Sequence, residues 1–144
     1  MTGRARALRR ATPAATIVRM LRIGMVVLGV GDMTRAVGFW TRALGYTVRE
    51  GGTGARWTVL TPAAGPGTEL ALMRSQTPVQ THPRVHVDLS VADAAGQAAE
   101  VERLLSLGAA RIAWDLYPDD PDFVVLADPD GNRFCVVDTS RGHD

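Results

Sequence analysis

The stretch RIGMVVLGVGDMTRAVGFWTRALG at residues 22–45 decides the fold, because the chain repeats its pattern at residues 84–108 as RVHVDLSVADAAGQAAEVERLLSLG. In this alignment Asp32 falls on Asp93, at an offset of 61 residues. A repeat of this length indicates two copies of one supersecondary unit. Each copy is too small to bury both faces of a sheet alone, so the two are expected to share a core.

A second echo pairs WTVLTP at 57–62 with FVVLADP at 123–129, and it extends the repeat beyond the helix. Apolar runs bounded by glycine and proline turns predict one strand, one helix and three further strands in each half. The expected strands are 22–30, 46–51, 55–61 and 68–74, then 84–91, 109–114, 122–127 and 132–138. We place module 1 at about 22–74, a linker at 75–83 and module 2 at about 84–139.

Both expected helices carry clear boundary signals. Asp32 and Asp93 precede them as N-caps, and Gly45 and Gly108 end them. In the first helix, Trp40 lies on the apolar stripe and is expected in the core. The second helix is expected to bury Ala94, Ala98, Val101 and Leu105.

The charge is unevenly distributed. All sixteen basic residues are arginine, and six of them lie in the first 22 positions, where no acidic residue occurs. The remainder carries ten arginines against fifteen acidic residues, a formal net charge of −5. We interpret 1–21 as a basic, flexible leader and 140–144 as a tail.

An acidic body disfavours nucleic acid as a partner, and no apolar run reaches the ~20 residues that span a bilayer. A single cysteine, Cys135, favours a reducing cytoplasm.

The motifs LGVGDMTRAVGFWTRALGY at 28–46 and DFVVLADPDGNRFCVV at 122–137 resemble the vicinal oxygen chelate superfamily, which includes glyoxalase I, bleomycin-resistance proteins and extradiol dioxygenases. The resemblance is to its small glyoxalase-like members and covers about residues 22–139. It implies an α+β fold in which two βαβββ modules form a U-shaped, partly open eight-stranded barrel around a ligand cavity. Such proteins bind small molecules and are commonly homodimers.

The resemblance also implies four metal-ligand positions, which in this chain are Met25, Ala71, His86 and Cys135. Alanine has no ligating atom, and only His86 is a usual ligand for zinc or iron. We therefore expect no cofactor, since Met25, Ala71 and Cys135 do not support a divalent metal. A soft cation such as Cu(I), held by Met25, His86 and Cys135, stays as an alternative.

Strand alternation predicts which side chains face the cavity. Val85, Val87 and Leu89 form a helix-facing row, which leaves His86 and Asp88 on the opposite face. By the same argument Leu70 and Leu72 face the helices, and Glu69, Ala71 and Met73 face the cavity. The catalytic candidates are His86 as base, Asp88 as its orienting partner and Glu69 as a second acid or base. The alternative is that both carboxylates pair with arginines such as Arg74 or Arg133.

The remaining cavity wall is expected to be apolar and aromatic, as in most small-ligand sites. Trp57 and Trp114 are either wall or core residues on the pattern alone. The predicted ligand-binding residues are Met25, Trp57, Ala71, Met73, Trp114 and Cys135.

Two functions fit this sequence. The first is a glyoxalase-like enzyme that moves protons on a small oxygenated metabolite, of the lyase or isomerase type and without the four-ligand metal site. The second is a bleomycin-resistance-type protein that binds and sequesters a small molecule without catalysis.

Overall fold

The computed structural model describes residues 20–142. Most of the proposed leader, at 1–19, and the last two tail residues, 143–144, lie outside the described part. The chain forms β1 (Met25–Val30), α1 (Met33–Leu44), β2 (Tyr46–Val48), β3 (Trp57–Pro62) and β4 (Glu69–Arg74). The second half forms β5 (Val87–Val91), α2 (Ala94–Leu107), β6 (Ala110–Arg111), β7 (Phe123–Ala127), β8 (Arg133–Asp138) and a short 3-10 turn, Thr139–Arg141.

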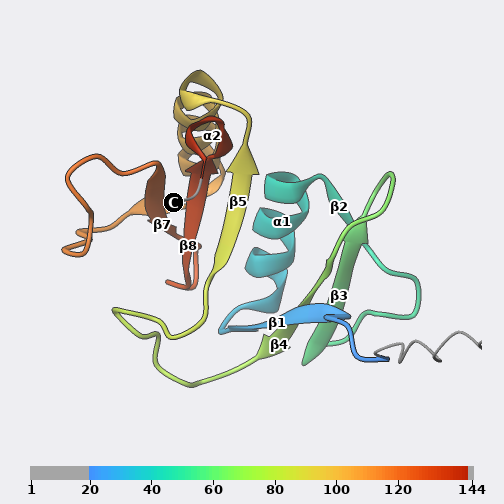
Figure 1. The fold of residues 1–144 in the computed structure, drawn as a ribbon. Coiled ribbons are helices and arrows are strands. Elements are labelled where there is room, and N and C mark those ends of the chain that lie inside the picture. Colours follow the sequence, from blue (N-terminus) through green and yellow to red (C-terminus); the bar gives the residue numbers. More distant parts are fainter. Residues whose placement is uncertain (1–19, 143–144) are drawn as a thin grey trace, which may run out of the picture.

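Each half builds one four-stranded sheet with the same strand order. Sheet 1 runs β1-β4-β3-β2 and sheet 2 runs β5-β8-β7-β6, and in each the first strand pairs in parallel with the last strand of its module. The eight strands remain in two open sheets that do not close into a barrel (Figure 1). The α+β class and the two βαβββ modules predicted from the repeat are thus confirmed.

The predicted caps define both helices. The Asp32 carboxylate accepts a hydrogen bond from the Arg35 backbone N–H at 3.0 Å, and the Asp93 carboxylate accepts one from Gly96 at 2.7 Å. Such a cap stabilises a helix by about 1 kcal/mol. Gly108 ends α2 at a φ of 117°, in the left-handed region that favours glycine.

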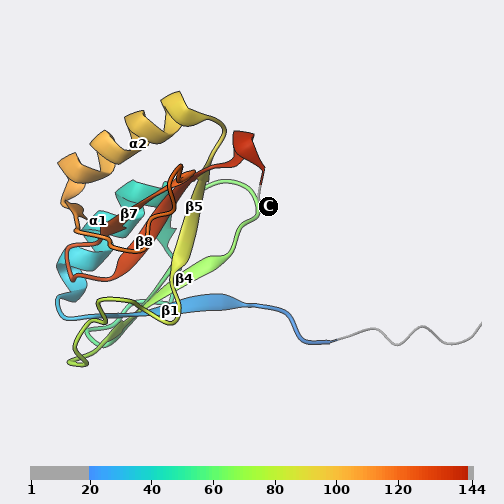
Figure 2. The same cartoon turned by 60° about the vertical axis from the view of Figure 1, so that its left-hand side comes forward.

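A single apolar core joins the two modules. It contains the helix-facing rows of both sheets together with α1 and α2. The rings of Trp40 on α1 and Phe134 on β8 meet edge to face, with centroids 5.3 Å apart. In Figure 1, α1 lies between the two sheets, and Figure 2 shows α2 running over sheet 2. Because the helix-facing rows share this core, the other face of each sheet points away from it.

The turn between β7 and β8 ties the modules together by hydrogen bonds. Asp128 is only 3% exposed, and its carboxylate accepts a hydrogen bond from the Trp40 indole N–H at 3.1 Å. The Asn132 side chain donates to the Gly29 carbonyl of β1 at 2.8 Å. Asp130 accepts hydrogen bonds from the backbone N–H groups of Gly31 and Asp32, at 2.9 and 3.2 Å. Residues of module 2 therefore hold the end of β1 and the start of α1.

The strands are shorter than the sequence predicts, and one helical face differs. The strand expected at 109–114 is only Ala110–Arg111, at the edge of sheet 2, where one neighbour supplies all its pairing. In α2 the buried residues are Val101 and Leu104, while the predicted Ala94 and Ala98 are exposed and Leu105 is half-buried. The two buried residues are spaced i, i+3, so the buried stripe passes through Leu104, one residue before the predicted Leu105. No described helix is long and apolar enough to cross a membrane.

Candidate functional site

The outer face of sheet 2 gathers three chemically active side chains. In the parallel pairing of β5 and β8, Asp88 lies directly opposite Cys135. His86 precedes β5 by one residue and projects to the same side as Asp88, because side chains two apart on an extended segment share a face. The sheet therefore brings together three of the residues that the sequence singles out, from positions 49 residues apart in the chain.

His86 and Asp88 form a pair on this face. The His86 Nε2 atom lies 3.1 Å from the Asp88 Oδ1 atom, and the two side chains are 46% and 50% exposed. The predicted orienting role of Asp88 matches this geometry, whereas the alternative pairing of Asp88 with an arginine is not seen among the described residues. With Nε2 donating its hydrogen to the carboxylate, the Nδ1 lone pair is left for another partner.

Cys135 lies beside this pair but is buried, with 7% of its surface exposed. Burial raises the pKa of its thiol to about 12, and the negative charge of Asp88 and a hydrogen bond to it act in the same direction. A thiol with this pKa stays protonated at neutral pH and is a poor nucleophile. Cys135 therefore lines this face as a buried wall residue.

These residues line a cavity of about 360 Å³ in the outer face of sheet 2. Its aromatic and apolar wall consists of Trp114, Leu116, Phe123 and Val137. The Trp114 ring packs edge to face against His82, with centroids 5.1 Å apart, so this tryptophan faces the cavity side and not the shared core. Polar groups on one side and aromatic rings on the other are the usual composition of a small-molecule site.

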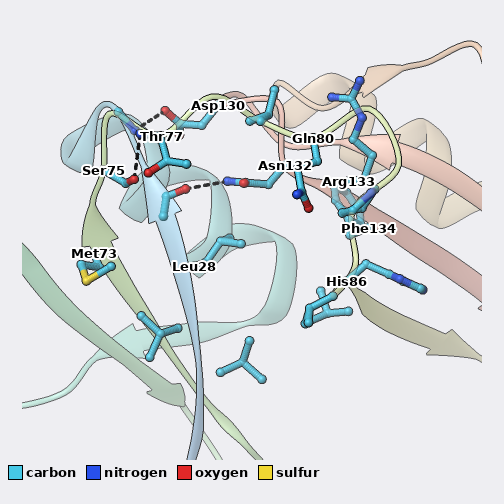
Figure 3. Close-up of a pocket in the computed structure, with 18 of the residues that line it drawn as sticks. Leu28, Met73, Ser75, Thr77, Gln80, His86, Asp130, Asn132, Arg133 and Phe134 are labelled. Carbon is cyan, nitrogen blue, oxygen red and sulfur yellow. Dashed lines mark hydrogen bonds between the residues drawn. The ribbon is translucent and has the colours of Figure 1, made fainter.

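A larger cavity of about 600 Å³ lies between the modules, beneath the linker. Figure 3 shows it with Met73 on one wall, His86 on the other, and Asp130 and Asn132 from the β7–β8 turn above. His86 lines both cavities, so it sits at the boundary between them. Met73 is the one predicted sheet 1 residue that shares a cavity with it.

The other predicted residues of module 1 lie on the outer face of sheet 1. Ala71 is buried, Trp57 is 39% exposed, and Met25 pairs with Glu69 across β1 and β4. Glu69 forms an ion pair with Arg49, with Nη1 and Oε1 2.9 Å apart. Pairing with an arginine is the alternative role that the sequence gives this carboxylate, although the arginines named there are Arg74 and Arg133. None of these four residues lines a cavity with His86 in a single chain. The predicted site is therefore divided between two outward faces.

The four metal-ligand positions implied by the resemblance do not fit a metal. Two of them, Met25 and Ala71, are on sheet 1, and Ala71 offers no donor atom. The soft-cation set of Met25, His86 and Cys135 stays a prediction, and Met25 lines neither of the two cavities described above.

Three residues that line the cavity are not named by the sequence prediction, namely Leu116, Asp122 and Phe123. Phe123 lines the cavity because it pairs with Val137 of β8 and alternates with Val124, which packs against the shared core. Its echo with Trp57 in the repeat is the signal that identifies this position. Leu116 belongs to the irregular segment between β6 and β7, for which no periodic signal exists.

The fold and these motifs match known proteins. The sequence model described as "Glyoxalase-like domain" matches residues 25–137, most of the chain. The chain therefore belongs to the glyoxalase-like domain family. No curated protein matches the chain in sequence.

Solved structures show the same fold at low identity. A glyoxalase/bleomycin resistance protein/dioxygenase family enzyme from Burkholderia phytofirmans superposes with a TM-score of 0.64 at 14% identity, covering 82% of this chain and 98% of its own. A glyoxalase-related enzyme from Fulvimarina pelagi gives 0.62 at 19% identity, covering 83% and 89%. A mutant fosfomycin resistance protein, FosX, from Listeria monocytogenes, in complex with Mn(II) and a dihydroxypropylphosphonic acid, gives 0.64 at 14% identity, covering 83% and 90%.

Proposed function

We propose that this protein is an enzyme that transfers protons on a small oxygenated metabolite, as a lyase or isomerase does. The observation that carries the proposal is the His86–Asp88 pair, 3.1 Å apart at the edge of an aromatic-walled cavity. A carboxylate bound to one imidazole nitrogen fixes the tautomer, and it stabilises the imidazolium that forms when the other nitrogen takes a proton.

In this mechanism the accepting atom is Nδ1 of His86. The C–H bond next to a substrate carbonyl loses its proton to Nδ1, and the electron pair moves onto the carbonyl oxygen as an enolate. With an α-hydroxy carbonyl, the hydroxyl proton passes to the former carbonyl oxygen, and return of the first proton to the former carbonyl carbon completes the isomerisation. With a leaving group on the β-carbon, the enolate electron pair expels that group and completes an elimination. The planar enolate packs against the ring of Trp114 or Phe123. No metal takes part, in keeping with the unsuitable donors at Met25 and Ala71.

Hydrogen exchange tests this proposal without knowledge of the natural substrate. Hydroxyacetone, dihydroxyacetone and the hemithioacetal of methylglyoxal with glutathione are incubated in D₂O with EDTA, and ¹H NMR follows loss of the α-proton signal. We expect exchange by the wild type with at least one probe, its loss in His86→Ala, and a large reduction in Asp88→Asn. Exchange that disappears with EDTA, or that persists in His86→Ala, contradicts the metal-free mechanism.

We further propose that a second copy of the chain covers the outer faces. Val27, Trp57 and Met73 form an exposed apolar patch on sheet 1, and Leu116 and Tyr117 are exposed beside the sheet 2 cavity. Burial of such patches favours association. A twofold-related copy that sets sheet 1 against sheet 2 brings Glu69 of one chain toward His86 of the other. This gives Glu69 the acid or base role that it lacks within a single chain.

Sedimentation velocity tests the dimer. We expect a homodimer for the wild type and a monomer for Trp57→Asp, with unchanged circular dichroism. If the wild type sediments as a monomer across micromolar concentrations, the site is confined to one chain and Glu69 has no catalytic part.

The aromatic wall also supports the second function, binding and sequestration without catalysis. The rings of Trp114 and Phe123 line the cavity, and aromatic rings stack on planar ligands. The dye 8-anilinonaphthalene-1-sulfonate serves as a planar probe. Saturable binding that quenches tryptophan fluorescence in the wild type but not in Trp114→Phe, together with no exchange in D₂O, favours this function over the enzyme.

A further inference from the structure

The metal donors of this chain are concentrated in module 2. Module 1 contributes Met25 and Ala71 at the family positions and offers no hard or borderline ligand there. In module 2, by contrast, His86, Asp88 and Cys135 offer one nitrogen, one oxygen and one sulfur atom on a single face. Asp88 is not one of the four family positions, so this group is a different constellation from the one that the family implies.

The three donor atoms are close enough for one cation. All of them lie within 4.8 Å of one another, and the His86 Nε2 to Asp88 Oδ1 distance is 3.1 Å. Tetrahedral zinc, with bonds of about 2.0–2.1 Å to nitrogen or oxygen and about 2.3 Å to sulfur, separates neighbouring ligand atoms by roughly 3.3–3.6 Å. The imidazole and carboxylate are already near that separation, and the thiol closes the remaining gap of roughly 1 Å by side-chain rotation.

The backbone holds this geometry without a loop rearrangement. Asp88 and Cys135 lie on paired strands in direct register, and Cys135 is flanked by the buried Val125 and Val137. His86 and Asp88 are half exposed, which leaves a path for the cation and room for a water as fourth ligand. Sites on rigid strands are more precise than sites on loops, and three protein ligands with one open position form a common zinc arrangement.

We propose that His86, Asp88 and Cys135 bind one zinc ion, within module 2 alone. Mixed nitrogen, oxygen and sulfur donors select zinc over magnesium or calcium, which require oxygen ligands. On binding, the thiol proton passes to solvent, and the thiolate and carboxylate balance the two positive charges of the ion. No electron transfer takes place.

Zinc at this site switches off the proposed proton acceptor, an effect that rests on the proposed function. The ion occupies the Nε2 lone pair of His86, so the ring proton must move to Nδ1. That nitrogen then has no lone pair with which to accept a proton from substrate. Zinc is therefore expected to inhibit hydrogen exchange in proportion to site occupancy, and EDTA to restore it.

Direct binding measurements test the site independently of any activity. Untagged protein is stripped with EDTA, dialysed and titrated with ZnCl₂ by calorimetry. We expect one zinc per chain. Loss of a residue that only supports a metal ligand commonly weakens binding 10–100-fold, so loss of a direct ligand is expected to cost at least on the order of 100-fold. His86→Ala, Asp88→Asn and Cys135→Ala should each show this loss.

The matched control is His82→Ala. His82 pairs with Asp115 at 2.6 Å on the surface, without a neighbouring thiol. Its substitution therefore tests whether a histidine–aspartate pair alone accounts for the zinc binding of the wild type. This variant should keep the wild-type affinity. Substitution with Co²⁺ gives a second readout, because a thiolate ligand produces a near-ultraviolet charge-transfer band. That band should be absent in Cys135→Ala.

Three results overturn the zinc site. They are no stoichiometric binding by the wild type, unchanged affinity in Cys135→Ala, or an equal loss in His82→Ala. Cys135→Val, which fills the buried position with an apolar side chain, replaces Cys135→Ala if the latter unfolds. Absence of hydrogen exchange with every probe contradicts the proposed function but leaves the calorimetric result intact, so the two failures are distinguishable.

Discussion

Replacement of Trp40 by phenylalanine tests whether the β7–β8 turn holds the two modules together. The Trp40 indole N–H is bonded at 3.1 Å to the carboxylate of Asp128, which is 3% exposed. Phenylalanine removes this donor and leaves a buried charged acceptor with one partner fewer, which costs about 1.5–3 kcal/mol. Phenylalanine also has one ring where the indole has two, and the volume lost at a position only 1% exposed adds about 1 kcal/mol.

The expected total is about 2.5–4 kcal/mol, a large part of the roughly 5–15 kcal/mol that stabilises a typical domain. At about 4 °C per kcal/mol for a chain of this size, the Tm should fall by on the order of 10 °C or more. Urea denaturation followed by circular dichroism gives the free energy of unfolding, and thermal melts give the Tm.

Trp57→Phe is the matched control at protein concentrations where the chain is monomeric, since Trp57 is then 39% exposed and its side chain has no hydrogen bond in the described structure. The same chemical change should there cost less than about 0.5 kcal/mol. If Trp40→Phe costs less than about 1 kcal/mol, or no more than Trp57→Phe, the turn does not carry the contact between modules that the structure assigns to it.

Three further predictions concern the same framework. Burial raises the pKa of Asp128 above its usual value, against the hydrogen bonds from Asn132 and Trp40. The folded chain therefore holds this proton more tightly than the unfolded chain, and stability must fall as pH rises through the folded pKa. The unfolding free energy of the wild type relative to Asp128→Asn, from urea titrations between pH 3 and 7, should decrease with pH, and an increase refutes this sign. Asp130→Ala removes the acceptor for two backbone N–H groups and should cost about 2 kcal/mol, whereas Arg35→Ala, whose side chain is 51% exposed, should cost less than about 1 kcal/mol; equal losses on denaturation contradict this ranking. Gly38→Ala, inside α1 with no atom within 4 Å of the added Cβ, should raise the unfolding free energy by about 0.5–1 kcal/mol, and a lowered Tm indicates a hidden clash.

The internal repeat predicted the fold well, because its signals are local. Helix caps at Asp32 and Asp93 and the two apolar periods are read from neighbouring residues, and the structure confirms both modules. The period of two also placed His86 and Asp88 on one face, as strand pairing with Cys135 requires.

The relative placement of the modules was not predictable in the same way. Which faces of the sheets share a core depends on contacts such as that between Trp40 and Phe134, which lie 94 positions apart and have no local signature. For this reason the sequence argument grouped Glu69 with His86 in one cavity, whereas each lies on the outer face of its own sheet. Similarly, the partner of Glu69 is Arg49, which directly follows β2 and lies across β3 from β4, a choice fixed by strand register.

The hydrogen bonds of Asp130 have a consequence for the order in which the protein matures during synthesis. Its carboxylate secures the backbone at Gly31 and Asp32, yet it is translated about a hundred residues after them. When the first module leaves the ribosome, the backbone N–H groups of Gly31 and Asp32 still lack the Asp130 acceptor. The Trp40 indole N–H likewise lacks its Asp128 acceptor. Completion of the amino-terminal half therefore waits until the β7–β8 turn of the second half has been synthesised. A nascent chain stopped within the linker should be sensitive to protease at α1, and one extended past β8 should be resistant.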